Sequence, residues 1–555
     1  MKLKLVNINN IFGNIKRTVL VKSKVNAVIL SGLLIACSAG LAGCEDFLGD
    51  NVNPDKSEDV TIDLVMPTAL FYSVVQDYDH AEYGAYLGQC LTTGGRSQTG
   101  SYAHRSGWEF LGMTRHPQWR RHFFDVGTNL NVLLEKAEEE NSVNYQALGG
   151  LLRLMSNQKT TDAFGDIPLS EAYGTTGAPK YDSQEDIYKW MHQEVDRLST
   201  LFDGEDINKP DNRAMNSRVD RVFAGDMAKW RQVLYGVKAR LLLRNLPNMN
   251  TDEATCNAII AAAEEALNGW SDPMYQFDGG SSVEQNCMWG RTNKGVNGWE
   301  SWNNNLIQAM PTAYFIEDVM GYDIANDTCP DPRLPYMMKK RADKSGKAVY
   351  RYLEANYGMP ATHNVEFYPD LHESVLTTDQ SAICLLTEAE LHFIIAEAAY
   401  WAGNKAKAHS HLIEGIQYHM NRLGVPAESI NAYVTNAELV PGSSNITLTD
   451  IMREKYKAMY LQPELWNDLR RYGYSNSDNG VVYSPLGEPE TVYPGLRRPY
   501  NLYEAYWAED NDWIQRINYD PETEEKYNRG ELERLGAFRN PEWLKKPMIW
   551  GRSSK

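Results

Sequence analysis

The sequence predicts a mainly α-helical protein in which pairs of helices carry long irregular loops. Apolar residues recur with helical spacing from about Met66 onward. Two helical segments within residues 385–423 are separated by a glycine, which is typical of a helical hairpin. Two other stretches, at about 269–384 and 475–555, are rich in Gly, Asn, Pro and aromatic residues and have no regular period. Such long loops often carry function.

Two helices in the first half follow from capping and spacing. Ser183 with Asp186 three residues later is a capping-box pattern, which predicts a helix start. Apolar residues then repeat on one helix face, namely Ile187, Met191, Val195 and Leu198. The next helix has the same pattern, with Trp230, Leu234, Val237 and Leu241.

The hairpin in the second half has the clearest boundaries. Its first helix is Ala-rich, runs from Leu385 to Ala402 and ends before Gly403. Its second runs from about Lys405 to Leu423, before Gly424 and a nearby proline. Small residues let two helices approach closely, as in tetratricopeptide-type repeats, although no clean repeat of about 34 residues is present.

The N-terminus indicates export and lipid anchoring. Its first 24 residues carry six Lys or Arg and no acid, and an apolar run and small residues lead to Leu41-Ala42-Gly43-Cys44. This tetrapeptide resembles the lipobox of bacterial lipoproteins, in which the cysteine is acylated. Leu34-Ile35-Ala36-Cys37 is a weaker second candidate, and a plain apolar helix is the alternative.

The predicted domain organisation follows from these features. Residues 1–43 form a lipoprotein signal peptide and residues 44–65 a lipidated tether. Residues 66–555 form a single domain, with a helical scaffold over about 66–268 and 385–474 and loop-rich insertions over the two irregular stretches.

Composition excludes several classes of function. Without the leader, 49 basic residues (55 less the six in the leader) face 73 acidic residues, a balance that argues against nucleic acid as a partner. Five cysteines after Cys44, an odd number without C-x-x-C spacing, make a zinc site improbable and reveal no disulfide pairing. We expect no metal and no cofactor, and the sequence does not decide whether a calcium ion supports a loop.

Six segments together carry a family resemblance. They are Thr161–Ala172, Pro179–Tyr188, Gly225–Leu241, Asp331–Leu334, Phe393–Ala399 and Ile451–Tyr474, and they include T-D-A-F-G-D-I-P, D-P-R-L, A-E-A-A and E-L-W-N-D-L-R-R. In this order behind a lipobox, they resemble the SusD/RagB family of nutrient-binding surface lipoproteins of Bacteroidetes. Gln462-Pro463 departs from the family's Gln-Gly, and the C-terminal motif matches only at Leu496–Tyr500.

The resemblance implies a SusD-like fold, in which tetratricopeptide-like units pack against a loop-rich ligand-binding half. It also implies surface exposure on the outer membrane and a SusC-like TonB-dependent transporter as partner. No catalytic activity comes with it. The hallmark polar and aromatic residues of the motifs are expected to pack in the core and fix helix register. They are Asp162, Asp166, Trp230, Glu397, Trp466, Asp468, Arg470 and Arg471.

Sugar rings favour flat aromatic side chains beside amides and arginines. The densest such stretch is Trp270–Asn305, where the candidate ligand-binding residues are Tyr275, Trp289, Arg291, Asn293, Trp299 and Trp302. A second stretch, Arg96–Trp108, adds Arg96, Tyr102 and Trp108. The alternative for each single Trp is that its side chain packs the loop against the helical scaffold.

Three other functions are alternatives to oligosaccharide binding and delivery to the transporter. A peptide-binding, RagB-like uptake receptor is the main alternative. A glycoside hydrolase requires two carboxylates about 5–9 Å apart in a cleft, and the sequence singles out no such pair. A pure tetratricopeptide scaffold does not explain the aromatic loop.

Overall fold

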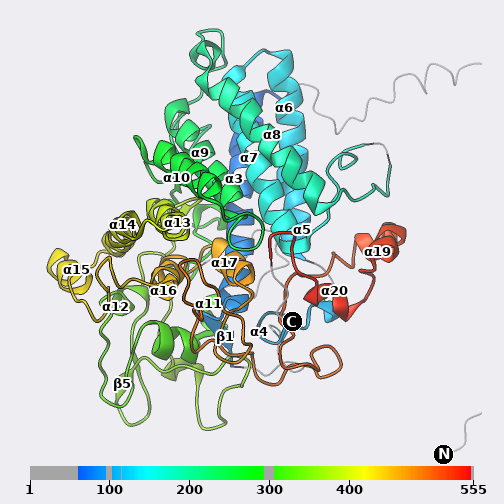
Figure 1. Cartoon of the computed structure of the whole chain (residues 1–555). Coiled ribbons are helices and arrows are strands. Elements are labelled where there is room, and N and C mark those ends of the chain that lie inside the picture. The colour runs from blue at the N-terminus through cyan, green and yellow to red at the C-terminus, as the bar shows by residue number, and fades with distance from the viewer. Residues whose placement is uncertain (1–59, 95–102, 114–115, 175, 293–304, 552–555) are drawn as a thin grey trace, which may run out of the picture. The chain divides into compact units, whose positions relative to one another are not determined.

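The computed structural model describes residues 60–94, 103–113, 116–174, 176–292 and 305–551. From Thr61 onward these residues belong to one compact unit (Figure 1). The predicted fold class is confirmed, because helices dominate and the described strands form short two-stranded ribbons. None of the described helices is both long and apolar enough to cross a bilayer.

The longer helices are α3 (Ile62–Leu87), α6 (Gly127–Glu139), α7 (Val143–Phe164), α8 (Gln184–Asp203), α9 (Met227–Leu243), α10 (Glu253–Leu267), α13 (Glu388–Trp401), α14 (Lys405–Leu423), α15 (Ala427–Val434), α16 (Leu448–Ala458) and α17 (Glu464–Arg471). Short helical turns are α4 (Ala103–Ser106), η1 (Phe110–Gly112), α5 (Pro117–Arg120), η2 (Arg121–Val126), η3 (Glu205–Asn208), η4 (Val283–Gln285), α11 (Asn305–Gln308), η5 (Tyr314–Val319), α12 (Leu334–Met337), η6 (Val365–Phe367), α18 (Glu524–Tyr527), α19 (Arg529–Leu535) and α20 (Pro541–Lys545). The strands pair as β1 (Leu91–Thr93) with β3 (Ala309–Pro311), β2 (Met274–Tyr275) with β6 (Ile383–Cys384), and β4 (Arg341–Ala342) with β5 (Ala348–Val349).

The helices pack mostly in chain order, as expected for stacked helical pairs. α6 packs on α7, α7 on α8, α8 on α9, α9 on α10, α10 on α13 and α13 on α14. The 26-residue helix α3 contacts α6, α7 and α17, and it runs through the middle of the helical part (Figure 1). This succession is the tetratricopeptide-like scaffold that the sequence predicted.

Helix boundaries largely follow the local signals. The Ser183 side chain accepts a hydrogen bond from the backbone N–H of Asp186, which confirms the predicted start of α8. α14 ends before Gly424, as predicted, and the φ of Gly424 is +81°, the left-handed conformation typical of a helix end. α13 begins slightly later than predicted, because Thr387 caps it by accepting from the N–H of Glu390. α3 begins about one turn before the predicted start.

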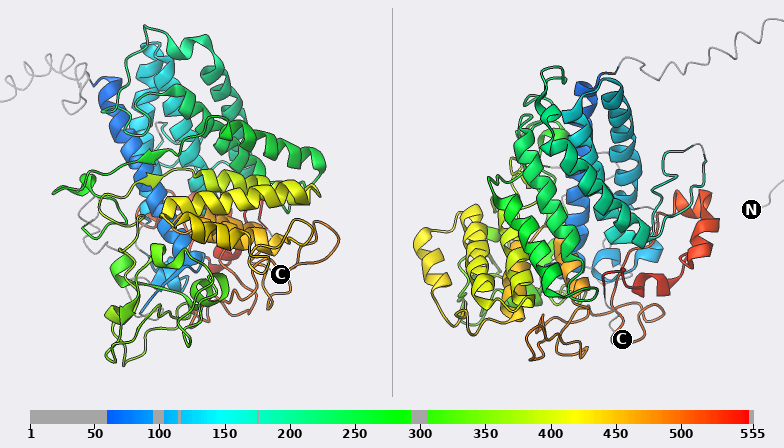
Figure 2. Two further views of the ribbon diagram at one scale, coloured as in Figure 1. Left: turned by 90° about the vertical axis from the view of Figure 1, so that its left-hand side faces the viewer. Right: turned by 45° about the horizontal axis from the view of Figure 1, so that its top comes forward.

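α13 and α14 lie side by side as an antiparallel hairpin (Figure 2). Gly415 on α14 makes this close approach workable, because a Cβ atom there would lie only 2.9 Å from the ring of Phe393 on α13. Gly415 therefore allows the close spacing of the two helices, from a residue of the second helix, whereas the sequence prediction rested on the alanines of the first.

A buried ion network joins the helices that carry the hallmark motifs. Arg471 on α17 lies 2.8 Å from Glu397 on α13 and 2.6 Å from Asp468. Lys455 on α16 lies 3.0 Å from the same two carboxylates. All four side chains are almost fully buried. The network fixes the relative register of three helices, because a shift would leave charges buried without partners.

The other hallmark residues are also structural. Three of them, Trp230, Trp466 and Arg470, are buried. Asp162 forms an ion pair with Arg244, at 2.8 Å. Asp166 is only half-buried, and it accepts a hydrogen bond from the backbone N–H of residue 184. The prediction that these motif residues pack in the core is therefore confirmed for the buried members.

The D-P-R-L motif has the same role. Arg333 pairs with Asp331 and, at 2.6 Å, with Glu454 on α16. Lys457 completes the cluster, at 2.9 Å from Asp331 and 2.6 Å from Glu454. This second buried cluster attaches the irregular segment before α12 to the helical scaffold.

The described cysteines are all free, and most of them are buried.

Candidate functional site

The β1–β3 ribbon brings together the two stretches that the sequence analysis named separately. The strands are antiparallel, with Thr93 opposite Ala309. β1 leads into residues 95–102, and residues 293–304 lead into β3 through α11. Because the end of one antiparallel strand lies beside the start of its partner, the strand that precedes residues 95–102 ends beside the start of the strand that follows α11. We call this place the loop base and define it as Thr93, Gly94, Ala309 and Met310.

Several predicted residues fall outside the described ranges, so their roles stay predictions. They are Cys44, Arg96, Tyr102, Asn293, Trp299 and Trp302. The remaining candidates are Tyr275, Trp289, Arg291 and Trp108, and the structure places each of them.

Trp289 is a core residue in the structure. Its side chain is 4 % exposed, and its ring meets Tyr78 of α3 edge-on, with 4.6 Å between centroids. The loop folds back onto α3, so Trp289 follows the alternative named for it above, in which a Trp packs its loop against the scaffold. The ring has no open face left for a sugar.

Tyr275 and Trp108 are also buried. Tyr275 is 4 % exposed and packs against Phe277. Trp108 is fully buried, with centroids 5.1 Å from Trp507 and 5.7 Å from Trp513. The sequence could not reveal this partnership, because the rings come from opposite ends of the chain. Neither residue offers a stacking surface in this arrangement.

Arg291 remains at the surface. Its side chain is 51 % exposed, and its guanidinium lies 2.8 Å from the carboxylate of Asp370, which Arg341 also contacts. Burial alone would raise the pKa of Asp370, but hydrogen bonding to Arg291 and the charge of Arg341 outweigh it and hold that pKa below its usual range. The Asp370 carboxylate therefore fixes the position of the exposed Arg291 guanidinium.

A pair of exposed tyrosines lies beside the loop base. The backbone N–H of Asn356 donates to the Thr92 hydroxyl at 3.0 Å, and that of Met359 donates to the Gly94 carbonyl at 2.8 Å. Tyr357, one of the two residues between them, is therefore held against the ribbon and is 50 % exposed.

Its partner is Tyr500, which is 43 % exposed. The two rings meet edge to face, with 5.3 Å between centroids, and the Asn356 amide donates to the Tyr500 carbonyl at 2.6 Å. Neither Tyr357 nor Tyr500 is among the candidate residues named from the sequence. A lone Tyr in a polar loop gives no signal, and only the ribbon reveals its position.

A separate groove lies between η2 and the C-terminal helices. It encloses about 1130 Å³ and is lined by Phe124, which is 59 % exposed, and by Phe538. An arginine lies over each ring, Arg120 at 4.9 Å and Arg529 at 4.2 Å from the centroid. Acidic side chains line the same groove, so it presents both charges.

Glu524 is a half-buried carboxylate of this groove. It accepts hydrogen bonds from the indole N–H of Trp119, at 3.1 Å, and from the hydroxyl of Tyr181. Burial raises the pKa of Glu524 above its usual range. These contacts tie α18 to the scaffold, which is a structural role.

The sequence profile of the SusD-like proteins, described as starch-binding and associating with the outer membrane, matches residues 61–482. A search of curated proteins found no match.

Solved structures show the same fold at low sequence identity. A SusD/RagB family protein from Bacteroides thetaiotaomicron is 15 % identical, with a TM-score of 0.65 over 90 % of this chain and 100 % of that one. A SusD homologue from Parabacteroides distasonis is 17 % identical, with a TM-score of 0.66 over 89 % and 98 %. A chitin-binding SusD homologue from Flavobacterium johnsoniae is 16 % identical, with a TM-score of 0.60 over 87 % and 95 %.

Proposed function

We infer the function of this chain from its family: it belongs to the SusD-like proteins, which are described as starch-binding and as associating with the outer membrane. We propose that it captures an oligosaccharide at the cell surface and delivers it to a SusC-like TonB-dependent transporter. In this proposal the chain binds its ligand and does not catalyse a reaction on it.

The observation that carries the proposal is the loop base. The strand before one candidate stretch pairs there with the strand after the other, and Tyr357 and Tyr500 are exposed beside it. Aromatic rings stack on the C–H face of a sugar, while amides and arginines bind its hydroxyls. We place the binding site here, with Trp299 and Trp302 as the stacking residues and Arg96, Tyr102 and Asn293 beside them.

Affinity at such a site comes from a few stacked rings and hydrogen bonds. Because binding also costs translational freedom and side-chain order, we expect modest affinity for a short oligosaccharide. A long polysaccharide that spans several receptors would bind more tightly through avidity.

Lipid anchoring at Cys44 is the second part of the proposal. Acylation on more than one position of this residue would hold the chain stably at the membrane, whereas one acyl chain binds only marginally. Surface attachment would place the loop base where polysaccharide arrives. The proposed domain organisation accordingly has a signal peptide, a tether and one SusD-like domain.

Peptide uptake is a second candidate function, and the groove at η2 favours it. Its lining carries Arg120, Arg529 and Arg539 together with Glu522 and Glu525. Charges of both signs suit a zwitterionic peptide better than a neutral sugar.

Calorimetric titration distinguishes the two. The chain beginning at Glu45 is titrated with soluble starch, chitin oligosaccharides, other glycans and mixed peptides. Saturable heat with one glycan class supports the proposal, and heat with peptides alone supports the second candidate. Absence of heat with every ligand would contradict both.

A further inference from the structure

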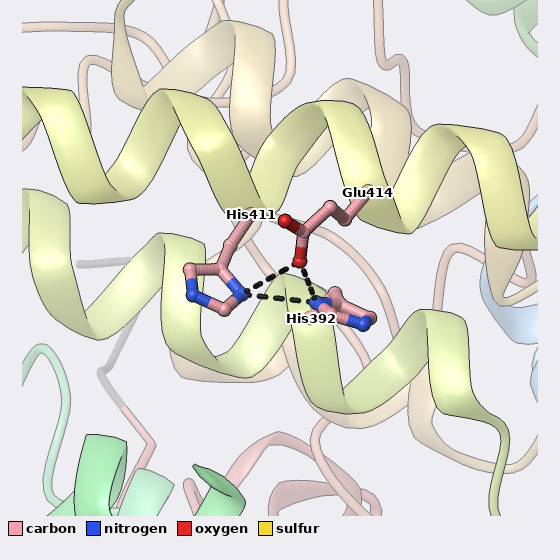
Figure 3. Close-up of side chains that lie close together, drawn as sticks. All are labelled: His392, His411 and Glu414. Atoms are coloured by element: carbon pink, nitrogen blue, oxygen red, sulfur yellow. Dashed lines mark hydrogen bonds and ion pairs between the residues drawn. The ribbon is translucent and has the colours of Figure 1, made fainter. Parts of the chain in front are cut away.

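We propose that His392, His411 and Glu414 form a binding site for a divalent transition-metal ion of the zinc class on the α13–α14 hairpin. Figure 3 shows the two imidazoles and the carboxylate turned toward one point between the helices. His392 belongs to α13, while His411 and Glu414 belong to α14. The site lies outside the regions considered for glycan or peptide, and it does not depend on the proposed function.

The donor atoms have suitable separations. Nδ1 of His392 lies 2.9 Å from Nδ1 of His411 and 2.9 Å from Oε2 of Glu414, and the remaining pair is 3.5 Å apart. Metal–ligand bonds of about 2.0–2.2 Å at tetrahedral angles place donor atoms about 3.3 Å apart. The three groups therefore need to move by only a few tenths of an ångström.

The hydrogen-bonding alternative satisfies the cluster poorly. If both imidazoles are neutral, one proton on the Nδ1 of either His392 or His411 must serve the lone pairs of the other two atoms. If both Nδ1 atoms carried a proton, the two N–H groups would face each other across 2.9 Å. A single cation takes up all three lone pairs at once.

Packing holds the ligands in place before a metal binds. The His392 side chain is 7 % exposed, and its ring stacks on Tyr418 with a 5.1 Å centroid distance. Gly415, next to Glu414, allows the close helix approach described above. The His411 side chain is 16 % exposed and that of Glu414 is 42 % exposed, so an ion can enter from solvent.

The chemistry of the donors defines the class of metal. Imidazole nitrogens favour zinc, copper, nickel and iron over calcium or magnesium, which prefer oxygen ligands. Three protein ligands leave one position for water. Because the ligands come from both helices, the ion would clamp α13 to α14 and stabilise the folded chain.

This site was not predicted from the sequence, because the metal prediction there rested on cysteine number and spacing alone. His411-x-x-Glu414 places two donors on one helix face, which was the available signal. The third donor, His392, is recognisable only once the hairpin is folded.

The test is a zinc titration of the full chain, purified without a histidine tag, by competition with a chromophoric chelator. We expect saturation at one tight site and a rise in melting temperature. His411→Ala and Glu414→Gln should each weaken zinc affinity by at least about 10- to 100-fold, and both should lose the thermal shift.

His409→Ala, on the same helix but outside the cluster, is the matched control and should bind zinc like the parent. Glu414 is half-exposed, so its glutamine variant should keep the fold even if His411→Ala does not. Absence of saturable zinc binding in the parent, or parent-like affinity in Glu414→Gln, would overturn the proposal.

Discussion

Thr93 on β1 lies opposite Ala309 on β3 in an antiparallel ribbon, although more than a third of the chain separates them. This pairing joins the bases of two segments whose residues suggest sugar binding. Without it, the two segments would be unrelated loops. With it, the described strands next to the two segments form one ribbon, and Tyr357 and Tyr500 lie beside that ribbon.

Tyr357→Ala and Tyr500→Ala should each weaken binding of the preferred glycan by about threefold to tenfold. One aromatic contact contributes about 0.5–1.5 kcal/mol, and 1.4 kcal/mol corresponds to tenfold in affinity. Because the two rings touch, the double variant should lose less than the sum. Calorimetry measures the effect. Tyr527→Ala, which removes a 71 % exposed tyrosine on α18, should bind like the parent; a loss of equal size there would argue against a local site.

Trp289→Ala should lower the free energy of unfolding by about 3–5 kcal/mol, as expected when a large buried aromatic is removed. Chemical denaturation measures this change. Phe124→Ala removes a ring that is 59 % exposed and should change stability by no more than about 0.5 kcal/mol. If Trp289→Ala kept the parent's stability but lost glycan binding, the ring would belong to the ligand surface after all.

The sequence predicts features that depend on neighbouring residues, but not those that depend on distant contacts. The start of α8 and the end of α14 could be predicted, because Ser183 and Gly424 act on their own neighbours. The buried motif residues were recognisable because polar groups on apolar helix faces need partners.

The burial of Trp108 could not be predicted, since it depends on rings from distant parts of the chain. The same holds for Tyr357, which reaches the loop base only through backbone hydrogen bonds to β1. Long-range pairing decides which aromatics are core and which are surface, and residue composition does not encode it.

Acid should destabilise the fold through the buried ion clusters. Burial alone would raise the pKa of Glu397, but Arg471 and Lys455 lower it to about 2, and Arg333 and Lys457 act likewise on Glu454. Because these pKa values lie below those of the unfolded chain, the stabilisation is present above about pH 5 and is lost as the pH falls toward 2.

Urea denaturation at a series of pH values between 7 and 3 measures this loss. Glu390, whose pKa is raised by burial, works in the opposite direction and reduces the slope. The loss should persist in high salt, since buried pairs are weakly screened. Stability that rose steadily from pH 5 to pH 3 would contradict the assignment.

Cys44→Ala should abolish lipid attachment and release the chain from the membrane fraction, because the acylated residue is the proposed anchor. Metabolic labelling with a fatty-acid analogue, followed by fractionation, tests this. Cys37→Ala is the matched control, since the weaker second motif ends there. Unchanged labelling of Cys44→Ala together with loss of labelling in Cys37→Ala would move the anchor to Cys37.

The central claim is that glycan binds at the loop base and not in the groove at η2. Its most direct test compares a Trp299→Ala/Trp302→Ala double variant with Phe124→Ala, each titrated calorimetrically with the glycan that the parent prefers. We predict at least a tenfold loss of affinity for the double variant, parent-like binding for Phe124→Ala, and unchanged helical content in both. Parent-like binding by the double variant together with loss in Phe124→Ala would contradict the account and place the ligand in the groove.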